Sequence, residues 1–209
     1  LKLQESAVKR YAVSAGLPLL QPADLRGEEF VAELVALRPD LGIVVAFKML
    51  PPAVFEVPRY GTFNLHASLL PQYRGAAPIN WAIINGERET GVTTFMLNPR
   101  MDEGAVIASR RVAIAEEDNA GTLHDKLMAT GAQLVTESVD AVAAEGFRPE
   151  PQPVVETLKP APKIFKETCH VDFSAEGERI VDLVRGVSPY PGAWGMLRER
   201  SAEEGSLVR

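Results

Sequence analysis

The spacing of apolar residues changes period several times along the chain, and each change marks a predicted element. Apolar positions that recur every three or four residues predict helices over residues 8–15, 30–37, 77–85, 119–145 and 175–187. Short apolar runs predict strands over residues 17–20, 41–47, 63–66, 91–97, 105–113, 171–173 and 193–197. Strands and helices alternate over the first 146 residues, which predicts an α/β domain with a mostly parallel sheet.

One predicted strand is apolar along its whole length. The run Leu41–Phe47 contains only apolar residues and glycine. Such a run is typical of a strand that is covered on both faces, as strands in parallel sheets are. We therefore expect this strand to be buried from both sides.

Proline separates the chain into two parts. The segment 147–166 contains Pro149, Pro151, Pro153, Pro160 and Pro162. Proline lacks a backbone donor and fits neither a helix interior nor a central strand. We therefore expect a linker over 147–166, between a domain over 1–146 and the beginning of a second one over 167–209.

Two polar residues whose side chains can take part in catalysis lie on the predicted strand 63–66, near its end. Asn64 and His66 are two positions apart, so a strand points both side chains to one face. An amide can donate to a developing oxyanion, and an imidazole can exchange a proton near neutral pH. Pro71 and Gly75 follow, which places the pair where a strand enters a loop, the usual position of sites in open α/β sheets.

Composition and charge exclude several classes of protein. The formal net charge of −6 argues against a general nucleic-acid coat, although a local basic patch could still hold one end of an RNA. Cys169 is the only cysteine, so no disulfide framework is possible. Its neighbour His170 does not turn it into a zinc site, because two adjacent ligands alone are a poor set. No apolar run approaches the ~18 residues that span a bilayer.

Three consecutive motifs resemble one enzyme family. The segment FNLHASLLPQYRGAAP, then INWAIINGERETGVTTF, then MDEGAVI, is similar to the folate-dependent formyltransferases, above all to those acting on methionyl-tRNA. The family's catalytic Asn, His and Asp correspond to Asn64, His66 and Asp102. Glu103 is the competing acid, but the order Met-Asp-x-Gly favours Asp102. Whether His66 acts as a base or as a cation stays open.

The resemblance implies a fold and a reaction. It implies a Rossmann-like formyltransferase domain, the linker, and then the start of a small, OB-like β-barrel. Against the family pattern, the chain lacks an N-terminal strand, loop and helix and most of the barrel, so we expect it to be a piece of a longer protein. The implied reaction transfers a formyl group from 10-formyltetrahydrofolate, a co-substrate, to initiator methionyl-tRNA. It implies an enzyme of the cytoplasm that uses no metal, binds no membrane and needs no obligate protein partner.

The resemblance also implies which residues contact the substrates. Arg74 would contact a phosphate or a folate carboxylate, with a surface salt bridge as an equal alternative. The bond Leu70–Pro71 is expected to be cis. The residues expected to line the folate site are Phe47, Met49, Leu50, Ser68, Leu69, Leu70 and Pro71.

Related enzymes share the Asn, His and Asp, so these residues cannot identify the acceptor. The run Arg-Gly-Ala-Ala-Pro argues against glycinamide ribonucleotide formyltransferase, and the hydrolase part of formyltetrahydrofolate dehydrogenase is a further relative. The segments Ala-Pro-Lys-Ile and Ser-Pro-Tyr-Pro-Gly favour the tRNA enzyme, with a sugar-nucleotide N-formyltransferase as the alternative. A non-catalytic nucleotide-binding module is another class, but the chain shows neither G-x-G-x-x-G nor a P-loop.

Overall fold

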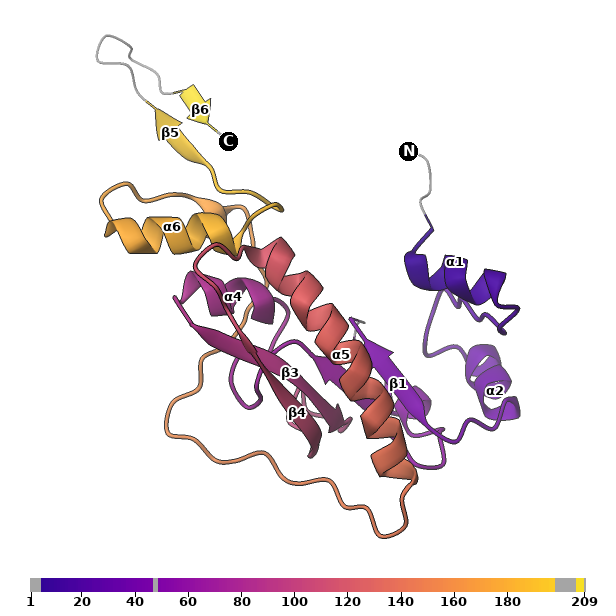
Figure 1. Cartoon of the computed structure of the whole chain (residues 1–209). Coiled ribbons are helices and arrows are strands. Elements are labelled where there is room, and N and C mark those ends of the chain that lie inside the picture. The colour runs from indigo at the N-terminus through magenta and orange to yellow at the C-terminus, as the bar shows by residue number, and fades with distance from the viewer. Residues whose placement is uncertain (1–4, 47–48, 198–205, 209) are drawn as a thin grey trace.

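A four-stranded sheet with helices around it forms the centre of the computed structural model, which describes residues 5–46, 49–197 and 206–208 (Figure 1). Its strands follow one another in chain order as β1-β2-β3-β4. Their bounds are Gly42–Val45, Thr62–His66, Glu89–Met96 and Val106–Ala113. The predicted α/β class is confirmed.

The sheet is mixed. β1 pairs in parallel with β2, and the chain between them includes the short helix α3, Pro52–Phe55. β2 and β3 are antiparallel, as are β3 and β4. The prediction of parallel pairing therefore holds for β1 and β2, whereas the loop 97–105 is short enough to join β3 and β4 directly as a hairpin.

Helix α5, Ala120–Ala143, crosses one face of the sheet (Figure 1). The side chain of Asn119 accepts hydrogen bonds from the backbone of Gly121 and Thr122, and Thr122 bonds back to the backbone of Asn119, which forms a capping box. Gly131 does not interrupt the helix. It lies against Leu65 of β2, where a Cβ would come within 2.7 Å of Leu65 Cδ2.

The main core lies between α5, the sheet and α4, Pro78–Ile84. Leu65 of β2 and Ala108 of β4 pack against this cluster from the sheet. The buried members are Ala82, Ile83, Val92, Ile114, Ala120, Leu123, Leu127 and Leu134. This packing fixes β2, and with it the position of the Asn64 and His66 backbone.

The N-terminal helices are packed differently. α1, Ala7–Ser14, and α2, Glu28–Ala36, form where the helical spacing predicts them, but neither buries a residue. Figure 1 shows both on the side of β1 that is remote from β3 and β4. The prediction that the strand Leu41–Phe47 is covered on both faces is wrong for β1, since Ile43 and Val45 remain 46% and 55% exposed at the sheet edge.

Two predicted strands are not strands in the structure. Residues 17–20 belong to no strand, Leu17 N instead donates to Ala12 O at 2.9 Å, and the Leu17 side chain is exposed. At 171–173, the Val171 backbone donates to Trp194 O, but Asp172 then accepts from the Ser174 backbone and starts a turn. Pairing there is limited to a bridge between His170 and Trp194. An apolar run without a neighbouring strand does not become part of a sheet.

The C-terminal part rests on α4. The linker leads to a short 3-10 helix, Glu167–Cys169, and then to α6, Gly177–Gly186, which packs on α4 (Figure 1). The side chain of Asn80 donates to Gly186 O at 2.7 Å. Beyond α6, β5 (Gly195–Leu197) pairs antiparallel with β6 (Ser206–Val208), as the apolar run 193–197 predicts for β5.

Candidate active site

β2 presents Asn64 and His66 on the face of the sheet opposite α5. Leu65, between them, points into the core beneath α5, so its two neighbours point to the other face. Asn64 is half-buried and His66 is 6% exposed. The side chain of Asn64 makes no hydrogen bond to any other residue that the structure describes.

The His66 ring is held by a hydrogen bond at one nitrogen and faces an acid with the other. Nε2 lies 2.9 Å from Tyr73 O, and because a carbonyl only accepts, Nε2 carries the hydrogen and donates it. Nδ1 faces the carboxylate of Asp102, at 4.0 Å from Oδ2. The ring therefore has one nitrogen engaged and the other turned toward an acid.

Asp102 is held from the opposite loop. It stands in the β3–β4 hairpin loop with a φ of 53°, a left-handed conformation that non-glycine residues rarely adopt. Its Oδ2 accepts a hydrogen bond from Gly75 N at 2.9 Å, and the side chain is 13% exposed. The competing acid, Glu103, points elsewhere and pairs with Arg74 at 3.2 Å and with Arg100 at 3.5 Å.

The loop after β2 is buried and hydrogen-bonded. Ser68 Oγ donates to Gln72 O at 2.7 Å, and Thr93 Oγ1 donates to Ser68 O at 2.7 Å. Ser68, Leu70 and Pro71 are buried, and Leu69 is half-buried. The bond Leu70–Pro71 is cis, as predicted. The loop therefore forms a firm wall beside His66.

The other predicted folate wall, after β1, is open. Phe47 lies outside the described residues. Met49 is 70% exposed, and Leu50 is half-buried. The structure thus separates the predicted folate residues into a buried group after β2 and an exposed group after β1.

Arg74 is engaged with protein groups rather than free. Its Nε and Nη2 donate to Gln152 Oε1 at 3.2 and 2.7 Å, and its Nη1 pairs with Glu103. The predicted salt bridge is therefore present. A substrate contact would have to use the part of the guanidinium that these partners leave accessible.

Tyr73 is a site residue that the sequence pattern did not indicate. Its carbonyl holds His66, and its own φ of 59° is left-handed. The buried phenol donates to Glu87 at 2.5 Å. Burial raises the pKa of the Tyr73 phenol, and the hydrogen bond to Glu87 acts in the same direction, so the phenol stays protonated as a donor.

The contacts of Gly75 and the whole role of Gln152 were not predicted either. Gly75 has a φ of 128°, and a Cβ there would lie 2.4 Å from Ala161 O, so only glycine fits. The glycine itself is visible in the sequence, but its partner in the linker is not. Gln152 bonds to both site loops from within the proline-rich segment, where no periodicity or motif singles it out.

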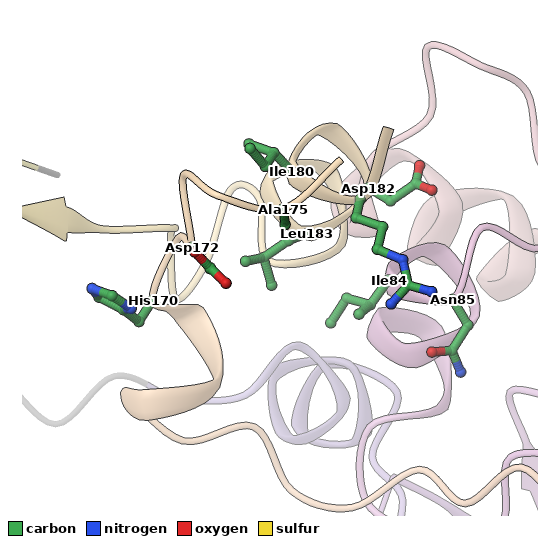
Figure 2. Close-up of a pocket in the computed structure, with 9 residues that line it drawn as sticks. Ile84, Asn85, His170, Asp172, Ala175, Ile180, Asp182 and Leu183 are labelled. Atoms are coloured by element: carbon green, nitrogen blue, oxygen red, sulfur yellow. The ribbon is translucent and has the colours of Figure 1, made fainter. Parts of the chain in front are cut away.

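A separate pocket of about 380 Å³ lies between α4 and α6 (Figure 2). It is lined by apolar residues such as Ile84 and Leu183 and by polar ones such as His170, Asp172 and Arg179. None of the predicted site residues lines it, so the chemistry is not placed there. Within residues 5–46, 49–197 and 206–208, no group of three metal-binding side chains occurs and no helix has the length and apolarity to cross a membrane.

Comparison with protein-family models gives two matches. Residues 1–139 match the model described as formyl transferase. Residues 163–203 match the model described as formyl transferase, C-terminal domain.

Curated relatives from two genera carry the same name. Methionyl-tRNA formyltransferase from Parabacteroides distasonis is 58% identical over 203 residues, which cover 93% of this chain and 61% of the relative. The protein of that name from Flavobacterium johnsoniae is 50% identical, covering 97% of this chain and 64% of the relative. The chain thus spans less than two thirds of the length of these relatives.

Two solved structures extend the comparison. One, described as a likely sugar N-formyltransferase from Mycobacterium tuberculosis, aligns with a TM-score of 0.72 and 26% identity, covering 97% of this chain and 88% of that one. HypX from Aquifex aeolicus, solved with tetrahydrofolic acid, aligns with a TM-score of 0.69 and 25% identity, covering 81% of this chain and 29% of that one.

Proposed function

Because the chain belongs to the formyl transferase family, we propose that it forms the larger part of a methionyl-tRNA formyltransferase. In this proposal, it transfers the formyl group of 10-formyltetrahydrofolate to the amino group of initiator methionyl-tRNA, in the cytoplasm. The observation that carries the choice of acceptor is the 58% identity to an enzyme of that name over 93% of this chain.

The proposed reaction moves an acyl group from one nitrogen to another. The methionyl amine forms a bond to the formyl carbon, and the carbonyl oxygen takes up the negative charge of the tetrahedral intermediate. The bond from this carbon to folate N10 then breaks, and the proton lost by the amine is balanced by one gained at N10. The site must supply a donor for the oxygen, a group that holds a proton, and protection from water.

Asn64 is the proposed donor to the oxyanion. Its NH₂ group is neutral and donates at every pH, and it has no partner within the described part of the chain. Its position on the same face of β2 as His66 supports this role, because both side chains can approach one reacting carbon.

His66 and Asp102 are the proposed proton-holding pair. Since Nε2 donates to Tyr73 O, Nδ1 is the ring nitrogen that can receive the amine's proton. A proton on Nδ1 would point toward Asp102 Oδ2, now 4.0 Å away. That distance exceeds the ~2.7–3.2 Å of a hydrogen bond, so the proposal requires the two groups to approach when the ring is protonated.

We further propose roles for the two walls of the site. The exposed Met49 and the half-buried Leu50 would contact the folate from the β1 side, and Ser68 to Pro71 would shape the pocket from the β2 side. Arg74 would contribute positive charge toward a substrate anion. The exposure of Met49 supports a ligand-facing role.

The proposed domain division follows the linker. We place the catalytic domain at 1–146 and the beginning of a C-terminal domain at 167–209. Support comes from the two family matches, which end at 139 and begin at 163, on either side of the proline-rich segment.

Formyl transfer to alternative acceptors tests the proposal. The protein, in excess over acceptor, is mixed with 10-formyltetrahydrofolate and either charged initiator tRNA, the same tRNA uncharged, or a nucleotide-linked amino sugar. We expect transfer to the charged tRNA alone. Transfer to the sugar alone would instead favour the activity named for the relative from Mycobacterium tuberculosis, which is 26% identical.

Two variants test the residue roles in the same assay. We expect His66→Ala to lower the single-turnover rate by ~10²–10⁴. We expect Asp102→Asn to lower the rate more than the affinity for a folate analogue, because the carboxylate acts on the imidazole in the transition state. A large loss of folate affinity with an unchanged rate would make Asp102 a folate ligand.

A further inference from the structure

We propose that Gln152 is a positioning residue that fixes Asp102 relative to His66; this inference rests on the proposed function. Gln152 lies in the linker, which the sequence pattern predicts as a simple connection between domains. Its side chain nevertheless bonds to both loops that carry the candidate catalytic pair.

The amide of Gln152 uses its hydrogen-bonding capacity on these two loops. Nε2 donates to Asp102 O at 2.8 Å and to Gly104 O at 2.9 Å. Oε1 accepts from Arg74 Nε at 3.2 Å and from Arg74 Nη2 at 2.7 Å. A neutral amide has two N–H donors and two acceptor lone pairs, so this side chain is saturated in one arrangement.

The two donated bonds act on a backbone that needs support. Asp102 has a left-handed φ of 53°, which is unfavourable for a residue with a side chain. Gly104 is confined as well, because a Cβ there would lie 1.6 Å from Met96 O. By holding the carbonyls of both residues, Gln152 keeps the turn in the conformation that directs the Asp102 carboxylate at His66 Nδ1.

The two accepted bonds act on the opposite loop. Arg74 stands between Tyr73, whose carbonyl accepts from His66 Nε2, and Gly75, whose backbone donates to Asp102 Oδ2. Gln152 therefore joins the residues that set the position of each side of the pair. The carboxylate and the ring are connected by the direct Gly75 bond and, in parallel, through this one amide.

The linker around Gln152 is itself anchored. On one side, the backbone of Glu150 exchanges hydrogen bonds with Val106 at 2.7 and 2.8 Å. On the other side, Lys159 O accepts from Tyr73 N at 2.7 Å, and Ala161 N donates to Arg74 O at 2.9 Å. Because the linker backbone is held on both sides of Gln152, the side chain of Gln152 can fix the positions of the two loops that it contacts.

The histidine ring reports on this geometry without requiring turnover. The chain contains three histidines, His66, His124 and His170. The latter two are exposed, and they lie on α5 and directly after the 3-10 helix, outside the two loops that Gln152 bonds to. Long-range ¹H–¹⁵N spectra of histidine-labelled protein are compared for wild type, Gln152→Leu, Gln152→Glu and Asp102→Asn. Gln133→Leu, an exposed glutamine on α5, is the matched control.

We expect both Gln152 variants to move the ring signals of His66 in the direction produced by Asp102→Asn. Gln152→Glu keeps the size of the side chain and an acceptor for Arg74, but it presents oxygen to the two carbonyls. The signals of His124 and His170 should stay in place in every variant, which controls for the fold, and Gln133→Leu should move none. Unchanged His66 signals in both Gln152 variants would overturn the inference.

Transfer kinetics give the second readout. Residues that orient metal-binding side chains typically contribute a factor of ~10–100, and we expect an effect of similar size here, with Gln152→Leu lowering kcat by ~10–100 at nearly constant KM for the folate. In an Asp102→Asn background, the same substitution should add less than threefold, because it acts through the carboxylate.

The outcomes separate the two proposals. Independent, multiplicative losses in the double variant, or wild-type turnover by Gln152→Glu, would overturn the positioning role. A wild-type protein that formylates none of the acceptors would overturn the proposed function. The His66 signals would still decide whether Gln152 sets the geometry of the pair.

Discussion

The two sides of β2 differ in how completely they are packed, and the candidate site lies across the boundary. Toward β3 and α5, Phe63, Phe95 and Leu123 are fully buried, each at 0% exposure. Toward β1, neither α1 nor α2 buries a residue, and Val45 is 55% exposed. Local patterns suffice to form helices on both sides, but only the first side has a core.

This contrast extends to the chemistry. Asn64, His66 and Asp102 belong to the packed side, where β2 positions Asn64 and hydrogen bonds from the loop after β2 hold His66 and Asp102. Met49, on the other side, has little support from the described residues. The loops that carry the proposed proton-holding pair are thus tied together by hydrogen bonds, whereas the residues proposed to contact folate after β1 lie at an open edge of the sheet.

The largest expected effect comes from removing a side chain on the packed side. Phe95→Ala should lower the free energy of unfolding by ~3–5 kcal/mol, because it deletes a fully buried ring. Phe165→Ala is the matched control, since that ring is 58% exposed. Urea denaturation followed by circular dichroism measures both. Equal losses would show that the packed side is not the source of stability.

A buried acid at the start of α5 gives a smaller effect that depends on pH. Asp118 is 3% exposed and accepts hydrogen bonds from Ala115 N at 2.8 Å, Thr122 Oγ1 at 2.9 Å and Lys126 Nζ at 2.6 Å. Burial opposes ionisation of Asp118, but these bonds and the Lys126 charge outweigh it and lower its pKa. The carboxylate therefore favours the folded state.

Asp118→Asn should cost ~1–3 kcal/mol at pH 7, and the difference from wild type should shrink in acid. Because the folded pKa is lowered, the contribution is complete above the unfolded value of ~3.9 and is lost as the pH falls through the folded value. Unfolding at pH 7 and near pH 3 measures this, with the exposed Asp125→Asn as control. A difference that persists unchanged in acid would contradict the assignment.

The smallest effect is expected on the open side. Val35 of α2 is 52% exposed, and alanine has the higher helix propensity. Val35→Ala should therefore change the free energy of unfolding by less than ~0.5 kcal/mol. A loss comparable to that of Phe95→Ala would mean that α2 packs as firmly as the core, and the comparison would fail.

Much of the fold could be predicted from periodicity, and the failures have a common cause. Helix α5 was predictable from its spacing and from Asn119 at its start. The exposure of β1 was not predictable, because the apolar run Leu41–Phe47 does not show that Val45 lies at the edge of the sheet. The prediction of a strand at 171–173 was wrong for a related reason, because its apolar residues do not reveal that a turn begins at Asp172.

The candidate site shows the same limit. The relation of Asn64 and His66 follows from strand geometry alone, since both lie on one strand. Choosing Asp102 required the family resemblance, because a turn acid carries no signal of its own. Tyr73 and Gln152 act through a carbonyl and through a side chain in an irregular segment, and no sequence period encodes either contact.

The contacts of the linker also set an order of assembly. The bonds from Gln72 to Thr157 and from Arg74 to Gln152 join residues that are 85 and 78 positions apart. A ribosome therefore releases β2, β3 and β4 well before the segment that ties their loops together. Loop closure over such separations makes these contacts slow to form. We expect a nascent chain to form the sheet first and to bring His66 and Asp102 into their observed arrangement only after residue 161 has emerged, so the candidate site is assembled later than the sheet that carries it.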